Sequence, residues 1–207
     1  MSPPSGERKS NELPPNFCFT TDDPFYSGPA TCNLLHYTPA AYMAGFIEMA
    51  MLASGSIWFW QLHSVNQSMD TWAVLCMFGL TAGGLVTTLL MFYGLKTEQA
   101  KLLSPKLAFI QLEITILMVL AAVAVVAMSF GISLTHQLFS VFVKVPEMER
   151  DFGPIWPFNI SVISFFAAAL CVWIRVLVSG AAEFILDKQF FTDAPSIEME
   201  KTLPRPE

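Results

Sequence analysis

The chain has 207 residues, of which 54% are hydrophobic and only 14% are charged, and its formal net charge at pH 7 is −6. Its mean hydropathy is +0.51, whereas a soluble domain usually carries about 25% charged residues. This composition excludes an ordinary soluble domain, and the lack of a basic stripe argues against nucleic-acid binding.

Residues 1–38 predict a disordered cytoplasmic tail. They contain six prolines and no apolar run, so they cannot bury enough apolar surface to offset the entropy of ordering. No signal peptide is visible, and the first span must therefore also act as the targeting signal. Cys32 lies just before that span and is a candidate for lipidation. Cys32 and His36 offer fewer than the four ligands that structural zinc usually needs, so we expect no metal site.

Four long apolar stretches follow, and each predicts a membrane-spanning helix. They lie at about 39–62, 71–95, 107–134 and 157–186. Each is long enough to cross the hydrocarbon core, where a helix satisfies its own backbone hydrogen bonds. The sequence therefore predicts an all-α fold, a four-transmembrane-helix bundle over residues 39–187. Residues 188–207 mix charges with prolines and predict a second disordered cytoplasmic tail.

Lysine and arginine predict the orientation of the bundle. If the N-terminus is cytoplasmic, the outer side holds only Lys144 and Arg150, whereas the cytoplasmic side holds eight basic residues: Arg8, Lys9, Lys96, Lys101, Lys106, Lys188, Lys201 and Arg205. The positive-inside rule then places both termini in the cytoplasm. Two sequons that begin at Asn66 and Asn159 fall on the outer side, close to the membrane, and are candidates for glycosylation.

Charged residues inside the spans are the most informative candidates for function. A charge near the bilayer centre costs about 3 kcal/mol on insertion scales, so it is usually paired or functional. The helix rise places Glu48, Glu113 and Arg175 at a similar depth, roughly 9–14 Å below the cytoplasmic surface. We expect them to form an intramembrane charge cluster. Three roles of these charges remain open: a structural ion pair, a proton- or cation-linked transport site, or side chains that extend to the membrane interface.

The second span carries a face of small residues formed by Gly79, Gly83 and Gly84. Such a face allows two helix backbones to approach closely. It serves either tight packing inside the bundle, or dimerisation or docking onto another membrane protein. No catalytic constellation, nucleotide motif or cofactor motif is visible, so we expect no catalytic residue and no enzymatic activity.

Three short motifs resemble the four-spanning lysosome-associated transmembrane protein family, in the form of a divergent, nematode-like member. The first joins Cys32 and His36 to a first span that contains 44–48, Ala-Gly-Phe-Ile-Glu. The second is Gly-Leu-Lys at 94–96 followed by Leu-Leu-Ser-Pro-Lys-Leu at 102–107, and the third is a long last span with a short tail. The resemblance covers about 32–187. It implies endosomal or lysosomal membranes, with the endoplasmic reticulum or plasma membrane as alternatives. The Pro-Pro-x-Tyr motif of many members is absent, since Phe17 occupies the tyrosine position.

These features predict a non-catalytic accessory subunit or adaptor in endomembranes. Its partners would be membrane lipids and other integral membrane proteins, because no reaction centre is visible and the tails are too short to hold a domain. The alternative is a small transporter or channel component that uses the glutamate and arginine residues inside the spans. A structural four-helix protein of junctions or vesicles is a third reading.

Overall fold

The computed structural model describes Tyr26 and residues 34–193. The four predicted spans correspond to α1 (Tyr37–Ser64), α2 (Thr71–Thr97), α3 (Ser104–Phe130) and α6 (Trp156–Asp193). Each of these four helices is long and apolar enough to cross a membrane. The predicted all-α, four-span membrane fold is therefore confirmed in the part of the chain that the structure describes.

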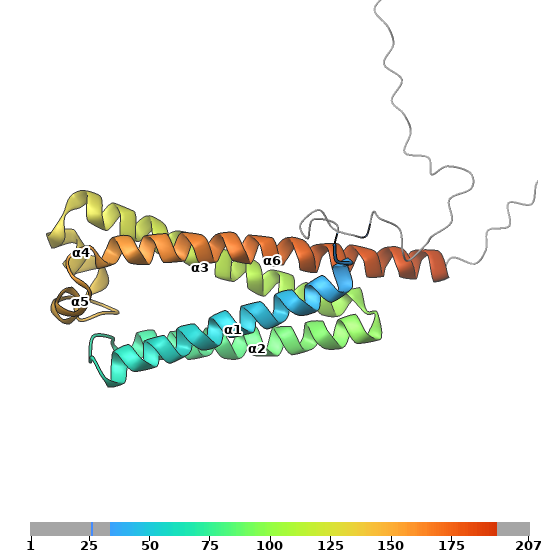
Figure 1. The fold of residues 1–207 in the computed structure, drawn as a ribbon, viewed down its shortest axis with the longest axis horizontal. Coiled ribbons are helices and arrows are strands. Elements are labelled where there is room, and N and C mark those ends of the chain that lie inside the picture. Colours follow the sequence, from blue (N-terminus) through green and yellow to red (C-terminus); the bar gives the residue numbers. More distant parts are fainter. Residues whose placement is uncertain (1–25, 27–33, 194–207) are drawn as a thin grey trace, which may run out of the picture.

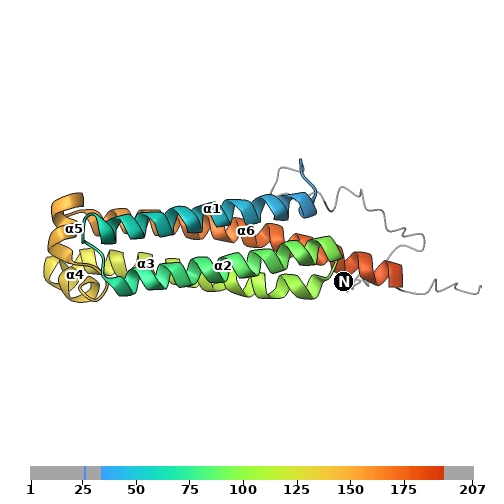
Figure 2. The same cartoon turned by 90° about the horizontal axis from the view of Figure 1, so that it is seen from below.

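The four long helices form two antiparallel pairs that lie against each other. α1 packs along α2, and α3 packs along α6, while α1 also contacts α6 and α2 contacts α3. Figure 1 shows that α1 begins and α6 ends at the same end of the bundle, which we call the terminal end. Figure 2 shows the opposite end, which carries the short helices α4 (Ile132–Phe139) and α5 (Val145–Phe152). We call this end the cap.

Small residues allow α1 to approach α6 closely. Ala40, Ala41 and Ala44 of α1 are almost fully buried. The ring of Tyr37 lies against Gly180 of α6, where an added Cβ would come within 2.7 Å of the ring atom Cζ. In lipid, helices associate through such close van der Waals packing rather than through the hydrophobic effect. Gly180 is thus a packing position that the sequence alone did not reveal.

A tight turn returns the chain from α2 to α3 through the short 3-10 helix η3 (Ala100–Leu103). Glu98 adopts the left-handed conformation with φ of 54°, and the next backbone N–H donates to the carbonyl oxygen of Gly94. A Cβ at Gly94 would lie 2.8 Å from the Cβ of Leu102. Glycine is therefore needed for η3 to fold back on α2. Pro105 follows in the first turn of α3, where its missing N–H costs no hydrogen bond.

Some element boundaries differ from those predicted. α3 ends at Phe130 rather than near 134, because Gly131 has φ of 92°, a conformation that ends a helix. α6 continues to Asp193 and so enters the predicted C-terminal tail. In the predicted N-terminal tail, Tyr26 is buried and donates a hydrogen bond to Asp187 of α6 at 3.0 Å. The remainder of both predicted tails, 1–25, 27–33 and 194–207, lies outside the described residues.

Candidate functional site

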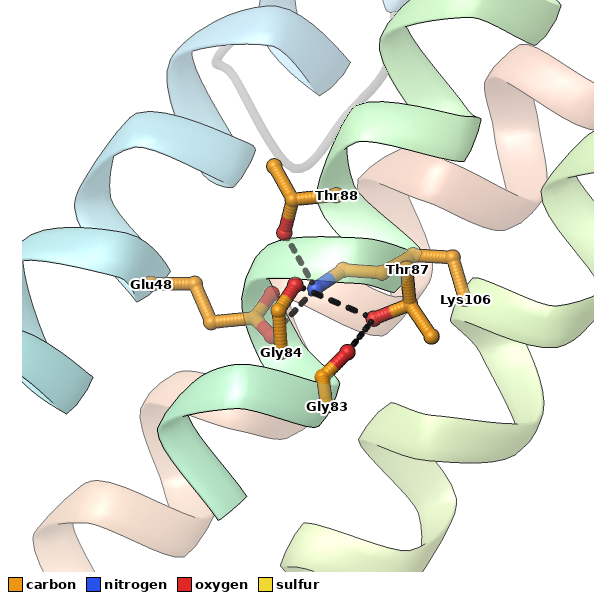
Figure 3. Close-up of polar contacts among 6 residues, drawn as sticks. All are labelled: Glu48, Gly83, Gly84, Thr87, Thr88 and Lys106. Atoms are coloured by element: carbon orange, nitrogen blue, oxygen red, sulfur yellow. Dashed lines mark hydrogen bonds and ion pairs between the residues drawn. The ribbon is translucent and has the colours of Figure 1, made fainter. Parts of the chain in front are cut away.

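Four polar side chains from three helices meet in the core of the bundle. Glu48 comes from α1, Thr88 from α2, and Lys106 and Glu113 from α3. We call this group the polar junction, and Figure 3 shows its contacts around Lys106. The side chains are exposed by only 0% at Lys106, 1% at Glu48 and 6% at Glu113. Charges with so little access to lipid headgroups or water must be compensated by one another.

An ion pair between Lys106 and Glu48 lies at the centre of the polar junction. The ammonium group of Lys106 donates to the carboxylate of Glu48 and, at 2.9 Å, to the hydroxyl oxygen of Thr88. It also lies 5.8 Å from the centre of the Phe109 ring, within the range of a cation–π contact. These contacts join α1, α2 and α3 through one ammonium group (Figure 3).

The turn after α2 positions Lys106 for this role. Because α3 begins at Ser104, Lys106 lies in its first turn, and its long apolar stem is buried between the helices. Glu113 follows seven residues later, which is about two helical turns, so both side chains lie on the same face of α3. Ile110, between them on that face, is fully buried.

The predicted pairing of Glu48 and Glu113 with Arg175 is wrong, because Lys106 is the cation of the cluster. Arg175 is exposed, and within the described part of the chain no ion pair involves it. The core-facing side of α6 is formed by residues such as Ile174 and Val178. The sequence alone places Lys106 among the cytoplasmic loop charges, because it directly follows Pro105. Its spacing of seven residues from Glu113 was the signal that could have revealed it.

Glu113 is buried, and no donor in the described part of the chain reaches its carboxyl group. Both of its carboxylate oxygens, and the second carboxylate oxygen of Glu48, are enclosed and accept no hydrogen bond in the described part of the chain. The charged side chains that act on Glu113 are those of Glu48 and Lys106. From α6, the buried thiol of Cys171 completes the surroundings. The polar junction therefore contains two carboxyl groups and one ammonium group.

The three glycines of the predicted small-residue face have different surroundings. A Cβ at Gly83 would lie 2.8 Å from the ring of Phe109 on α3, and a Cβ at Gly84 would collide with Leu52 of α1. Thr87 donates to the carbonyl oxygens of both glycines, at 3.0 and 3.1 Å (Figure 3). Gly79 has no such neighbour within 4 Å. Gly83 and Gly84 therefore pack inside the bundle, and only Gly79 faces outward.

The serine hydroxyls of both sequons are engaged inside the fold. Ser68, which completes the sequon of Asn66, is fully buried and donates to Asp151 at 3.1 Å. Ser161, which completes the sequon of Asn159, is buried and donates to the backbone of α3. Neither sequon hydroxyl is freely accessible once the chain has folded. Glycosylation at Asn66 and Asn159 stays a prediction.

His36 has a structural role at the start of α1. Its Nδ1 accepts a hydrogen bond from the backbone N–H of Thr38, and its ring packs edge-on against Phe184 of α6 with 4.5 Å between the ring centres. Across Tyr26 and residues 34–193, no group of three or more His, Cys, Asp or Glu side chains could hold a metal ion. Cys32 lies outside the described residues, so its lipidation stays a prediction.

Comparison with known proteins finds one curated protein of similar length. The chain is 42% identical over 190 residues to "Protein cuti-1" of Caenorhabditis elegans, and the alignment covers 92% of this chain and 94% of the relative. No protein-family model and no solved structure matches the chain. The alignment therefore includes all four spans and the polar junction.

Proposed function

This chain belongs to the family of Protein cuti-1 of Caenorhabditis elegans, and we propose that it is a non-catalytic multi-pass membrane protein. It would act as an accessory subunit or adaptor for other integral membrane proteins or for lipid traffic. The outward face of α2 supports this role. Gly79 has open space around it, and its neighbours Cys76 and Ala82 are exposed. Another transmembrane helix could approach such a smooth surface closely.

The position of α2 in the bundle adds to this argument. α2 packs against α1 and α3, and the small residues Gly83 and Gly84 serve those contacts. Gly79 is exposed on the same helix and takes no part in the contacts of α2 with α1 and α3. Glycine nevertheless weakens a helix by about 0.5–1 kcal/mol relative to alanine. A partner helix that packs over Gly79 would account for this residue.

A bulky residue at Gly79 tests the accessory role. Gly79→Leu should leave the fold intact, because no atom of the bundle lies within 4 Å of an added Cβ. Ala169→Leu, at an exposed position of α6, is the matched control. After extraction into native lipid nanodiscs, the wild type and Ala169→Leu should run as a complex larger than the purified chain, and Gly79→Leu should not. Equal complex sizes for all three proteins would refute the proposal.

We also propose endosomal or lysosomal membranes as the location, with both termini in the cytoplasm. The resemblance of the turn at 94–107 and of the entry to α1 to lysosome-associated four-span proteins supports this location. The excess of basic residues in the sequence segments predicted to be cytoplasmic supports the orientation. Fluorescent tags at each terminus, read with a membrane-impermeant quencher in isolated organelles, test both statements. Quenching of only one tag would refute the orientation.

A second candidate function is that of a small transporter or channel component. The buried carboxyl group of Glu113, which receives no hydrogen bond from a donor among the described residues, favours it, because ionisable groups inside membrane spans often mark ion or proton pathways. Glu113→Gln separates the two candidates in reconstituted vesicles. A transporter should lose flux while it stays folded, whereas an accessory subunit should show no flux in either form.

A further inference from the structure

We propose that the polar junction is a proton-binding site, in which one exchangeable proton is held by the carboxyl group of Glu113 and shared with that of Glu48. This site goes beyond the accessory role and does not depend on it. A protein that carries such a site would respond to the acidity of the compartment with which the junction exchanges its proton.

The charge balance of the polar junction carries the proposal. Glu48 and Glu113 bring two carboxyl groups, and Lys106 brings one ammonium group, so the fully ionised junction has a net charge of −1. All three side chains are more than nine-tenths buried within the membrane-spanning helices. An uncompensated charge is unfavourable in such surroundings. One additional positive charge makes the junction neutral.

The hydrogen bonds show where the additional charge belongs. The ammonium group of Lys106 is directed at Glu48 and Thr88. Within the part of the chain that the structure describes, both oxygens of Glu113 and one oxygen of Glu48 are left without a donor. A protonated Glu113 acts as a donor and can form a hydrogen bond with the carboxylate of Glu48. One proton therefore supplies both the missing charge and a missing donor.

The geometry favours a proton over a metal ion. Among the described residues, the junction offers three carboxyl oxygen atoms that receive no hydrogen bond, all from Glu48 and Glu113. Cations such as calcium or magnesium take six or more oxygen ligands and usually keep water among them. An ammonium group already occupies one side of the junction and would repel a second cation. A proton needs no coordination shell and no additional space.

All four long helices contribute groups to the polar junction or its surroundings. α1 provides Glu48, α2 the hydroxyl of Thr88, α3 the ammonium group of Lys106, and α6 the thiol of Cys171. Arg175 of α6 is exposed and takes no part. Release of the proton to water converts the acid at Glu113 into a carboxylate and leaves a net negative junction. The helices that enclose it should then separate enough to admit water.

Infrared spectroscopy of the protein in lipid bilayers tests the site, because a protonated carboxyl group has its own C=O stretching band. At neutral pH the wild type should show one protonated carboxyl group per chain, and its band should shift in heavy water. Glu113→Gln should abolish the band. Glu48→Gln should abolish it too, because one carboxylate and one ammonium group balance without a proton. Lys106→Met should show two protonated groups.

Glu183→Gln is the matched control, since Glu183 is exposed on α6 and bonds only to Ser179 in the described part of the chain. This variant should keep the wild-type band. Absence of the band in the folded wild type would overturn the proposal whether or not any variant folds. A band that survives in folded Glu113→Gln would overturn it as well.

Discussion

Removal of the ammonium group from the polar junction should destabilise the bundle strongly. In Lys106→Met the carboxyl group of Glu48, which is 1% exposed, loses its ion-pair partner, and Thr88 loses its donor. Loss of one partner from a buried ion pair costs about 3–5 kcal/mol. We expect a decrease of that size in the free energy of unfolding at neutral pH. The decrease should shrink as the pH falls, because the carboxyl group left behind must be protonated in the folded state, and protonation costs less free energy at lower pH.

The double variant Glu48→Gln/Lys106→Met isolates the pair itself. With both charges removed, no unpaired charge remains at this position, so most of the lost stability should return. The coupling energy from the double-mutant cycle should be about 2–3 kcal/mol. Reversible unfolding in mixed micelles, followed by helical circular dichroism, provides the four free energies.

Arg175→Met serves as the control, because Arg175 was the cation expected from the sequence and is exposed in the structure. Its free energy of unfolding should differ from that of the wild type by about 0.5 kcal/mol or less. Equal losses in Lys106→Met and Arg175→Met would show that Lys106 is not the buried cation that neutralises Glu48. A larger loss in Arg175→Met would restore the pairing expected from the sequence.

Three further predictions use the same unfolding measurement. Thr88→Val removes the hydroxyl that accepts from Lys106 and should cost about 1.5–3 kcal/mol, whereas Thr87→Val, which loses bonds only within α2, should cost less. Equal losses would contradict the assigned role of Thr88. Gly180→Ala should cost about 1–3 kcal/mol because the ring of Tyr37 must move. Gly79→Ala should instead raise the free energy of unfolding by about 0.5–1 kcal/mol, because no described atom of a neighbour lies within 4 Å of the added Cβ. A larger loss of stability in Gly79→Ala than in Gly180→Ala would contradict the packing of Tyr37 against Gly180. Glu98→Gln removes an ion pair with Lys188, in which the side chains are 53% and 32% exposed, and should cost about 1 kcal/mol or less. A loss as large as that of Lys106→Met would show that burial does not decide the strength of these pairs.

The spans could be predicted because lipid imposes a simple rule on the sequence. A helix that crosses the membrane needs about 20 apolar residues, and α1 and α2 lie within two residues of the predicted bounds at each end. Hydropathy is less informative where the backbone conformation determines the residue at which a helix ends. The end of α3 depends on the positive φ of Gly131. α6 continues past the apolar stretch, where Asp187 accepts a hydrogen bond from Tyr26.

The polar junction shows why the candidate site could be predicted only in part. Glu48 and Glu113 stand out because acidic residues are rare in apolar stretches, and both are buried. Which basic residue pairs with them depends on how each helix is rotated about its axis. The depth of a residue along its helix does not reveal that rotation. Arg175 and Lys106 were both available, and packing directs Lys106 inward and leaves Arg175 outward. Gly180 was missed for the same reason, because its importance comes from the ring of Tyr37 on another helix.

Solid-state NMR of the protein in lipid bilayers tests most directly whether Lys106 and Glu48 form an ion pair inside the membrane. With ¹⁵N-labelled lysine and ¹³C-labelled glutamate, the side-chain nitrogen of Lys106 should show a dipolar cross-peak to the carboxyl carbon of Glu48. The cross-peak is assigned by its disappearance in Lys106→Met and in Glu48→Gln. In the wild type, the side-chain nitrogen of Lys106 should show no contact with water. A Lys106 nitrogen that contacts water and lacks the cross-peak in the folded wild type would contradict the account.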